Sequence, residues 1–247
     1  MTDYPEVVVL LITYERTDVA RETIKGIKDR IIYPNLSWHI ADDGSQDGHV
    51  QRLRSEIGPD FYVTESNTGG HSVGRSMNIG VEQALKRADI WLHWEDDWVP
   101  NFRIELIPCV ELLTHNKDIG MIRLGRLSEG LHGNVIKGGD RLWWHLDKTK
   151  DLWCWTGHAA VRHKRFFDAY GTYKEGLTPG RTELCYQDAF NSKTGPGVVW
   201  PAWARYDICD HIGDGYSYKE AMENRNLTRE AAAKEFSDRM DLLKVPA

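Results

Sequence analysis

Two groups of adjacent acids directly follow apolar stretches of the sequence. Asp42-Asp43 follows residues 38–41, and Glu95-Asp96-Asp97 follows residues 90–94. The first pair also fits a simple turn, because Asp and Gly are favoured there. Three consecutive carboxylates repel one another by about 4 kcal/mol per close pair at an effective dielectric near 20. A bound divalent cation removes that cost, and crowded oxygen donors suit Mg²⁺ or Mn²⁺. The second group therefore predicts a metal site.

His211 is the candidate for a third metal ligand. It lies in a polar, turn-like segment, residues 206–215, beside Asp210 and close to Asp207 and Asp214. The chain has ten histidines, and most of them are expected to be surface or core residues. The acidic neighbours and the turn residues favour His211 over the others.

The segments that must position these acids alternate between strand and helix patterns. Short β-branched or aromatic runs indicate strands and apolar residues at helical spacing indicate helices. The pattern predicts strands at residues 7–12, 38–41, 61–64 and 90–94, with helices at 16–29, 49–57 and 75–87. Such alternation predicts a doubly wound, mainly parallel α/β sheet with helices on both faces. Ligands of such sheets bind beyond the carboxyl ends of the strands, where both acidic groups lie.

The second part of the sequence has a looser pattern. It predicts a helix at 101–116, a strand at 119–124, a glycine-rich loop at 125–139, and helices at 161–170, 183–191 and 228–243. No repeat or linker marks a boundary, so we expect a single domain over 1–247. We expect this domain to have two functional halves, 1–100 and 101–220, and a helical tail at 221–247.

Composition narrows the class of protein. The 247 residues carry a net charge of −6, which disfavours a broadly basic nucleic-acid coat or a polybasic membrane anchor. The longest apolar run is too short to span a bilayer, and no secretory signal is evident, so we expect a cytoplasmic protein without integral membrane contact.

The four cysteines contain no Cys-x-x-Cys pair and are expected to be free thiols. The ten tryptophans fit either a partly wet binding surface, where the indole N–H finds a partner, or an aromatic-rich core.

Four segments together resemble GT-A fold glycosyltransferases of the family-2 type. The resemblance is carried by Tyr14-Glu15-Arg16, Asp42-Asp43-Gly44-Ser45-Gln46-Asp47, Asn67-Thr68-Gly69 with Arg75-Ser76-Met77-Asn78-Ile79-Gly80, and the acids at 95–97. These motifs occur in the family's order and cover the first hundred residues. With less coverage, residues 156–162 and Gln187-Asp188 look like elements of the acceptor side.

The resemblance implies that 1–100 is a nucleotide-sugar-binding half and 101–220 an acceptor-binding half, and it implies roles for the matching positions. Thr13 and Tyr14 would hold the uracil and ribose of a UDP-sugar, and Asp43 would accept a hydrogen bond from the uracil N–H. Donor contacts would come from Thr13, Tyr14, Arg16, Asp43, Arg75 and Asp96. The metal, Mn²⁺ or Mg²⁺, would be bound by Glu95, Asp97 and His211.

Sugar transfer from a nucleotide sugar releases a diphosphate, and a divalent ion neutralises the charge that develops on it. An inverting transfer also needs a base that accepts the proton of the acceptor hydroxyl. Asp188, on a predicted helix, is the first candidate for this base, and Glu183 is the second. The tryptophans at 143–144 and 153–155 would supply a stacking surface for the acceptor.

Other functions remain open at this point. A histidine such as His211 is better known in retaining enzymes of the same fold. A sugar nucleotidyltransferase would carry a glycine-rich phosphate loop after the first strand, where residues 13–16 have none. A carbohydrate-binding protein without activity would leave the acids unexplained. The acceptor could be a glycan, a lipid-linked sugar, a protein or, as in phage enzymes, a modified nucleobase in DNA. The last would need a basic surface, for which residues 162–165 are the densest candidate.

Overall fold

The computed structural model of the chain describes residues 4–70, 72–125, 132–202 and 208–213. The chain divides into two compact units, residues 1–210 and 211–247. The helix predicted at 228–243 lies outside the described residues. Among the helices that are described, none has the length and apolar character needed to cross a membrane.

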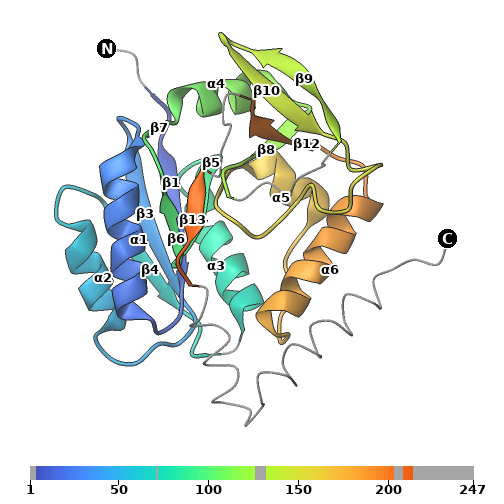
Figure 1. Cartoon of the computed structure of the whole chain (residues 1–247). Helices are drawn as coiled ribbons and strands as arrows, with labels where there is room; N and C mark the ends of the chain where they lie inside the picture. The colour runs from blue at the N-terminus through green and yellow to red at the C-terminus, as the bar shows by residue number, and fades with distance from the viewer. Residues whose placement is uncertain (1–3, 71, 126–131, 203–207, 214–247) are drawn as a thin grey trace. The chain divides into compact units, whose positions relative to one another are not determined.

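Unit 1 is organised around a nine-stranded sheet with the order β4-β3-β1-β5-β11-β8-β12-β10-β9 (Figure 1). The first four strands in this order pair in parallel, and so do β8 and β12. Only β11 and β10 run against their neighbours, so the predicted, mainly parallel sheet is confirmed. The strands of this sheet are β1 (Val7–Thr13), β3 (Leu36–Asp42), β4 (Val63–Asn67), β5 (Ile90–Glu95), β8 (Ile119–Arg123), β9 (Gly133–Gly138), β10 (Arg141–Leu146), β11 (Ala160–His163) and β12 (Gly197–Pro201).

Six described helices connect and cover these strands. They are α1 (Thr17–Arg30), α2 (His49–Ile57), α3 (Val73–Leu85), α4 (Ile107–His115), α5 (Lys164–Tyr170) and α6 (Pro179–Ser192). Four short strands complete the described elements: β2 (Ile31–Ile32), β6 (Trp98–Pro100), β7 (Ile104–Glu105) and β13 (Cys209–His211). The α1, α2, α3 and β5 predictions are confirmed to within two residues at each end.

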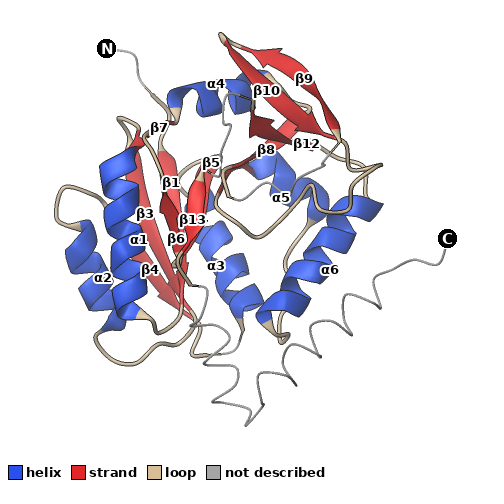
Figure 2. Ribbon diagram, in the orientation of Figure 1, coloured by secondary structure: helices blue, strands red, loops and turns tan. Residues whose placement is uncertain are grey.

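Strand β1 explains why helices lie on both faces of the sheet. Its seven residues are all buried, and successive side chains point to opposite faces. Val9 packs in one core cluster with residues of α1, α2 and α4, and Leu10 packs in another with residues of α3, α5 and α6. Figure 2 shows α1 and α2 on one side of β3 and β4, with α3 on the other. The predicted covering of both faces is confirmed.

The predicted helix at 101–116 is wrong in its first half. Ile104 and Glu105 instead form β7, which pairs with Ile31 and Ile32 of β2. The helix α4 begins at Ile107, with a proline in its first turn, where the missing proline N–H costs nothing. The short strand pair therefore takes the residues that the sequence pattern assigned to the helix.

Three further boundaries differ from the predictions. Residues 160–163 form β11 rather than the start of a helix, because this strand fills the gap between β5 and β8. Residues 133–138, predicted as loop, form β9 by pairing with β10, while residues 126–131 lie outside the described chain. Strand β4 begins two residues later than predicted, at Val63. In each case a partner strand decides the conformation. The four cysteines are free, as predicted.

Candidate functional site

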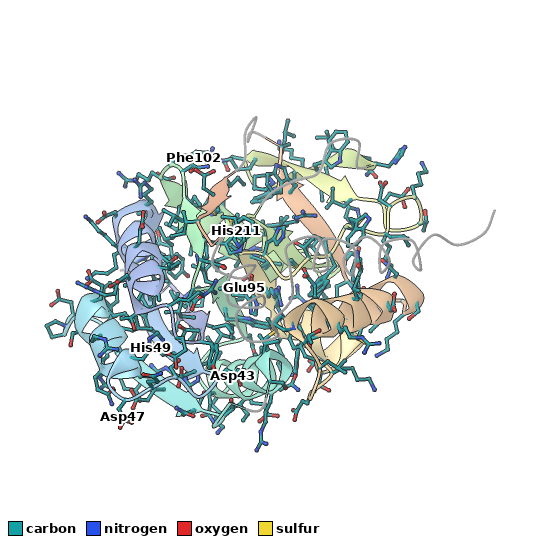
Figure 3. The ribbon with its side chains drawn as sticks, turned by 60° about the horizontal axis from the view of Figure 1, so that its bottom comes forward. Asp43, Asp47, His49, Glu95, Phe102 and His211 are labelled. Atoms are coloured by element: carbon teal, nitrogen blue, oxygen red, sulfur yellow. The ribbon has the colours of Figure 1, made fainter. Side chains whose placement is uncertain are left out.

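The ends of three neighbouring strands bring the two acidic groups to one edge of the sheet. In the β1–β3 pairing Thr13 lies opposite Asp42, and in the β1–β5 pairing Ile12 lies opposite Glu95. Because the three strands are parallel, the residues that follow them emerge at the same edge. Figure 3 shows Glu95 near the middle of the view, with Asp43 and His49 lower in the picture.

Asp42 closes the turn that leaves β3. Its side chain is fully buried and accepts hydrogen bonds from the backbone N–H of Gly44 and of Ser45, at 3.3 and 3.0 Å. It also accepts from the Ser45 hydroxyl and, at 2.6 Å, from the Asn67 amide. Gly44 has a φ of +94°, a conformation that favours glycine, and a β-carbon there would lie 2.2 Å from the backbone N of Gly70. Asp42 is therefore a structural acid.

Asp43 points away from this turn and is partly exposed. Its Oδ1 accepts hydrogen bonds from the Thr68 hydroxyl at 2.6 Å, the Ser76 hydroxyl at 3.1 Å and the Ser72 N–H at 3.2 Å. The motif at 67–69 and the start of α3 thus orient the carboxylate. All of its described bonds go to one oxygen. Arg75, in the first turn of α3, is exposed.

Asp96 is almost completely buried, and its carboxylate is held on both oxygens. Its Oδ2 accepts from the Thr13 hydroxyl at 2.7 Å and from the Tyr14 N–H at 3.2 Å, while its Oδ1 pairs with the Arg16 guanidinium. Burial raises the pKa of Asp96 to about 6, although Arg16 acts in the opposite direction. Thr13, predicted to contact the donor, has its own hydroxyl engaged by Asp96. Tyr14 is 46% exposed, so its ring is open to a ligand.

His49 was not predicted as part of the site. It lies at the start of α2, and its Nε2 lies 2.9 Å from the Thr13 hydroxyl oxygen, while its Nδ1 lies 2.8 Å from that of Thr17. Because Thr13 donates its proton to Asp96, it must accept from Nε2–H, which leaves Nδ1 to accept from Thr17. Burial lowers the pKa of His49, which favours this neutral form. No motif marked His49, since its partners are distant in sequence.

Arg16 joins the two acids that follow β5. In addition to Asp96, its Nη1 donates to Asp97 Oδ2 at 2.8 Å. The Arg16 side chain is 19% exposed, whereas those of its two partners are 1% and 7% exposed. Burial lowers the pKa of Arg16, but the two carboxylates raise it more, so the net direction is upward. The predicted donor-binding arginine therefore binds the acids of the predicted metal site.

Glu95 and Glu183 approach each other across Gly157. Glu183 on α6 accepts a hydrogen bond from the Gly157 N–H at 2.7 Å. The Oε1 atoms of Glu183 and Glu95 lie 3.2 and 3.4 Å from the position that a β-carbon would take at Gly157. Burial raises the pKa of Glu95 to about 8, and the nearby charges of Asp97 and Glu183 add to the shift. A cation or a proton in this place would relieve the repulsion between the acids.

Asp188, the first candidate for the base, lies elsewhere on α6. It is exposed, whereas the neighbouring Gln187 is buried and donates to the carbonyl of Leu152 at the base of the loop after β10. Residues five apart on a helix point about 140° away from each other. Asp188 and Glu183 therefore cannot face the same ligand, and the structure brings Glu183, not Asp188, to Glu95.

Two of the four tryptophans expected at the acceptor surface, and one residue of the candidate basic run, are buried. Trp143 and Trp155 are buried in the core, whereas Trp153 is 39% exposed and Trp144 is partly buried. Their indoles fill the space between the sheet and its covering elements. Arg162 of the basic run is also buried, at 1% exposure, and donates to the Tyr173 hydroxyl. The run at 162–165 is therefore no continuous basic surface.

The described carboxylates suit a divalent cation whose other coordination positions are filled by a bound substrate. Glu95 and Asp97 offer hard oxygen donors, and the Arg16 cation already lies against Asp97. Among the described residues, no group of three or more Asp, Glu, His or Cys is arranged around a common metal position. Mg²⁺ is commonly bound by one or two carboxylates together with substrate phosphates. His211 begins the second unit, so its role as a metal ligand stays a prediction.

A pocket of about 220 Å³ lies apart from these acids. It is lined by residues that include Phe102, Cys109, Leu124 and Arg141. None of its lining residues belongs to the acidic groups. The carboxylates at the strand ends, rather than this pocket, carry the chemistry of the candidate site.

Comparison with known proteins identifies the fold. No family model and no curated protein sequence matches this chain. Among solved structures, TarS from S. aureus matches with a TM-score of 0.56 and 14% identity over 80% of this chain and 36% of its own. GalNAc-T7, solved with UDP, GalNAc and Mn²⁺, matches with a TM-score of 0.58 and 13% identity over 80% of this chain and 42% of its own.

A third match is the mannosyltransferase PcManGT from Pyrobaculum calidifontis, solved with GDP-Man and Mn²⁺. Its TM-score is 0.52 and its identity 15%, over 99% of this chain and 67% of its own. The chain thus spans less than half the length of the TarS and GalNAc-T7 chains that it matches. Together with the strand-end acids, these likenesses define the class: the chain has a GT-A-like glycosyltransferase fold.

Proposed function

We propose that this chain transfers a sugar from a UDP-sugar to an acceptor hydroxyl, with a bound divalent cation. The observation that carries the proposal is that Asp97 and Glu183 lie beside Glu95, at the same edge of the sheet as Asp43. Two structural neighbours, TarS and GalNAc-T7, are solved with UDP-GlcNAc or UDP, and two are solved with Mn²⁺. These ligands support the same donor chemistry for this chain.

The donor end is assigned from the groups available to a nucleotide. Asp43 is oriented through its Oδ1 by three hydrogen-bond donors, and as an acceptor it suits the ring N–H of uracil. The exposed Tyr14 ring offers a flat apolar surface to the base or ribose. Exposed Arg75 provides a positive charge near the start of α3. A bound Mn²⁺ or Mg²⁺ would neutralise the charge that develops on the departing diphosphate.

The acceptor end is assigned to Glu183. We infer that its carboxylate accepts the proton of the attacking hydroxyl, so the transfer proceeds with inversion. Two facts support it over Asp188: the hydrogen bond from the Gly157 N–H fixes its position, and Glu95 faces it. The Gly157 backbone leaves open the space between the two acids that any side chain would fill. The acceptor itself is assigned no further than a hydroxyl group.

Glu183→Gln tests the assignment with Asp188→Asn as its matched control. Loss of a general base lowers the rate by about 10²–10⁴-fold. We expect E183Q to lose transfer by such a factor while UDP affinity, measured by calorimetry, stays unchanged. D188N should keep the wild-type rate. The donor is first found by screening UDP release from a panel of UDP-sugars, with and without Mn²⁺.

Three contrary results would each overturn a different part of the proposal: the base, the stereochemistry or the donor class. If D188N loses transfer and E183Q does not, the base is Asp188. If NMR of the product reports a retained anomeric configuration, the inverting mechanism is wrong. If neither UDP nor any UDP-sugar binds in the presence of Mn²⁺, the donor class is wrong, and the fold serves another reaction.

A further inference from the structure

We infer that Arg16 is a built-in counter-cation that competes with the divalent metal ion for Asp97. The inference rests on the proposed function, because it needs a metal ion at the acids after β5. Arg16 donates to Asp97 Oδ2 at 2.8 Å, and a second nitrogen of the same guanidinium pairs with Asp96 Oδ1. One arginine thus spans both acids.

Asp96 holds the Arg16 guanidinium from a fixed position. The other oxygen of Asp96 is already held by the Thr13 hydroxyl and the Tyr14 N–H. Asp96 is therefore fixed in place and remains an anchor for the guanidinium. Asp97 Oδ2 accepts from Nη1 of the same guanidinium, and the Arg16 side chain, at the N-cap of α1, is 19% exposed. The contact between Arg16 and Asp97 is the one that a metal ion can replace.

The backbone around Arg16 aims the side chain at the acids. Glu15 and Arg16 have φ values of +56° and +26°, a region that residues other than glycine seldom occupy. This conformation is supported by the Glu15 N–H, which donates to the Ser45 hydroxyl at 2.7 Å, and by Glu15 Oε1, which accepts from the Gln46 N–H at 2.9 Å. Both partners belong to the turn that carries Asp43, so the nucleotide-binding turn and the aim of Arg16 are linked.

Electrostatics determine whether Arg16 or the metal ion is favoured at Asp97. A guanidinium and a divalent ion on the same carboxylate repel each other at close range, so metal binding without a nucleotide is weakened. A diphosphate adds negative charge that draws the metal ion to Asp97 and can also accept from the released guanidinium. We therefore expect Mn²⁺ and UDP to bind cooperatively, with Arg16 leaving Asp97 while it stays on Asp96. Arg16 is in this sense a positioning residue for the metal ion.

Mn²⁺ titration tests the competition. Free Mn²⁺ is followed by electron paramagnetic resonance with and without UDP, for the wild type, Arg16→Met and Arg16→Lys. Arg21→Met is the matched control, since Arg21 lies on α1, which begins directly after Arg16, but pairs with Glu56 on the surface. We expect R16M to bind Mn²⁺ without UDP about tenfold more tightly or more, and to lose most of the UDP-dependent gain. R16K and R21M should resemble the wild type. An R16M affinity equal to or below that of the wild type overturns the inference.

A measurement on the wild type keeps the test valid if R16M fails to fold. The Nε–H resonance of Arg16 is followed by NMR on addition of Mg²⁺, UDP, or both. We expect a shift when both are present, and no shift would overturn the inference. If the wild type binds no Mn²⁺ even with UDP, it is the proposed function that fails. If the wild type binds Mn²⁺ with UDP and R16M behaves identically, only the role of Arg16 fails.

Discussion

The two acidic pairs at this edge of the sheet are neutralised by different means. Asp42 and Asp43, after β3, bond to hydroxyl groups, backbone N–H groups and one amide, and in the described part of the chain neither forms an ion pair. Asp96 and Asp97, after β5, share the guanidinium of Arg16. The first pair is held by neutral donors of its own turn and of residues 67–76, whereas the second is held by a charged side chain from the loop after β1.

This difference separates structural from functional acids. Neutral donors fixed by a turn stabilise a carboxylate without competing for a metal ion, so Asp42 completes the fold, and Asp43 stays available through its second oxygen. A side-chain cation, in contrast, occupies a carboxylate that a metal ion of higher charge also attracts. Adjacent acids of identical type can therefore have opposite roles, and their partners decide which role each one has.

The largest expected effect falls on the second pair. Asp97→Asn should lower UDP-sugar turnover by about 10²–10³-fold, because the metal ion loses a charged ligand at the departing diphosphate. The free energy of unfolding should change little, since the amide still accepts from Arg16. Initial rates at saturating Mn²⁺ measure the effect, with Asp60→Asn, an exposed acid after α2, as the control. Turnover of D97N close to that of the wild type would exclude Asp97 as a metal ligand.

A second expected effect is a loss of stability on acidification. It concerns His39, which, like Asp42 and Asp43, is held by neutral hydrogen-bond partners. His39 in β3 bonds to the hydroxyls of Thr64 and Ser66, at 2.8 and 3.0 Å. Burial, assisted by Lys86, lowers the pKa of His39 to about 4. Because the folded pKa lies below the ordinary value of 6.5, the unfolded chain binds the proton first. Stability should therefore be constant above pH 6.5 and fall by about 3 kcal/mol between pH 6.5 and 4.

Urea unfolding at several pH values measures this loss. The variant His39→Gln keeps a donor and an acceptor in the same place but does not titrate. The difference between wild type and variant isolates His39 from the other buried histidines. If both lose stability in parallel over this pH range, His39 is not the group responsible.

The smallest expected effect falls on the turn after β3. Asp42→Asn replaces an oxygen that accepts hydrogen bonds by an amide that cannot, which leaves a buried donor unsatisfied. We expect a loss of about 2 kcal/mol in the free energy of unfolding. UDP affinity, measured at a temperature at which circular dichroism shows the variant to be folded, should stay within about threefold of the wild type. A loss of UDP binding without a loss of stability would assign Asp42, rather than Asp43, to the nucleotide.

Much of the sheet edge that carries Asp43 and the acids at 95–97 could be predicted from the sequence. Continuous apolar strands such as residues 7–12 must be covered on both faces, and acids placed directly after parallel strands must emerge at one edge. Asp43 and the acids at 95–97 were found in this way. The sequence could not show that Arg16 pairs with Asp96 and Asp97, because the residues lie 80 and 81 positions apart. His49 was missed for the same reason.

The acceptor side was less predictable. The strand β11 resembles the start of a helix in sequence and becomes a strand only because β5 and β8 flank it. The rotation of α6 brings Glu183 inward and Asp188 outward, which depends on packing against α3 and α5 rather than on local pattern. The tryptophans at 143–144 and 153–155 were expected at the acceptor surface, yet two of the four are buried, because aromatic side chains also fill a core.

The sequence by itself determined the parallel strands of the first half, the positions of the acids at their ends and the turn residues between them, since these depend on local periodicity and chain direction. The tertiary structure alone decided which acid receives a cation, which carboxylate of α6 faces Glu95, and which indoles are buried. The physical reason is that charge pairing and burial depend on distances between residues that are remote along the chain, and only the folded packing sets those distances.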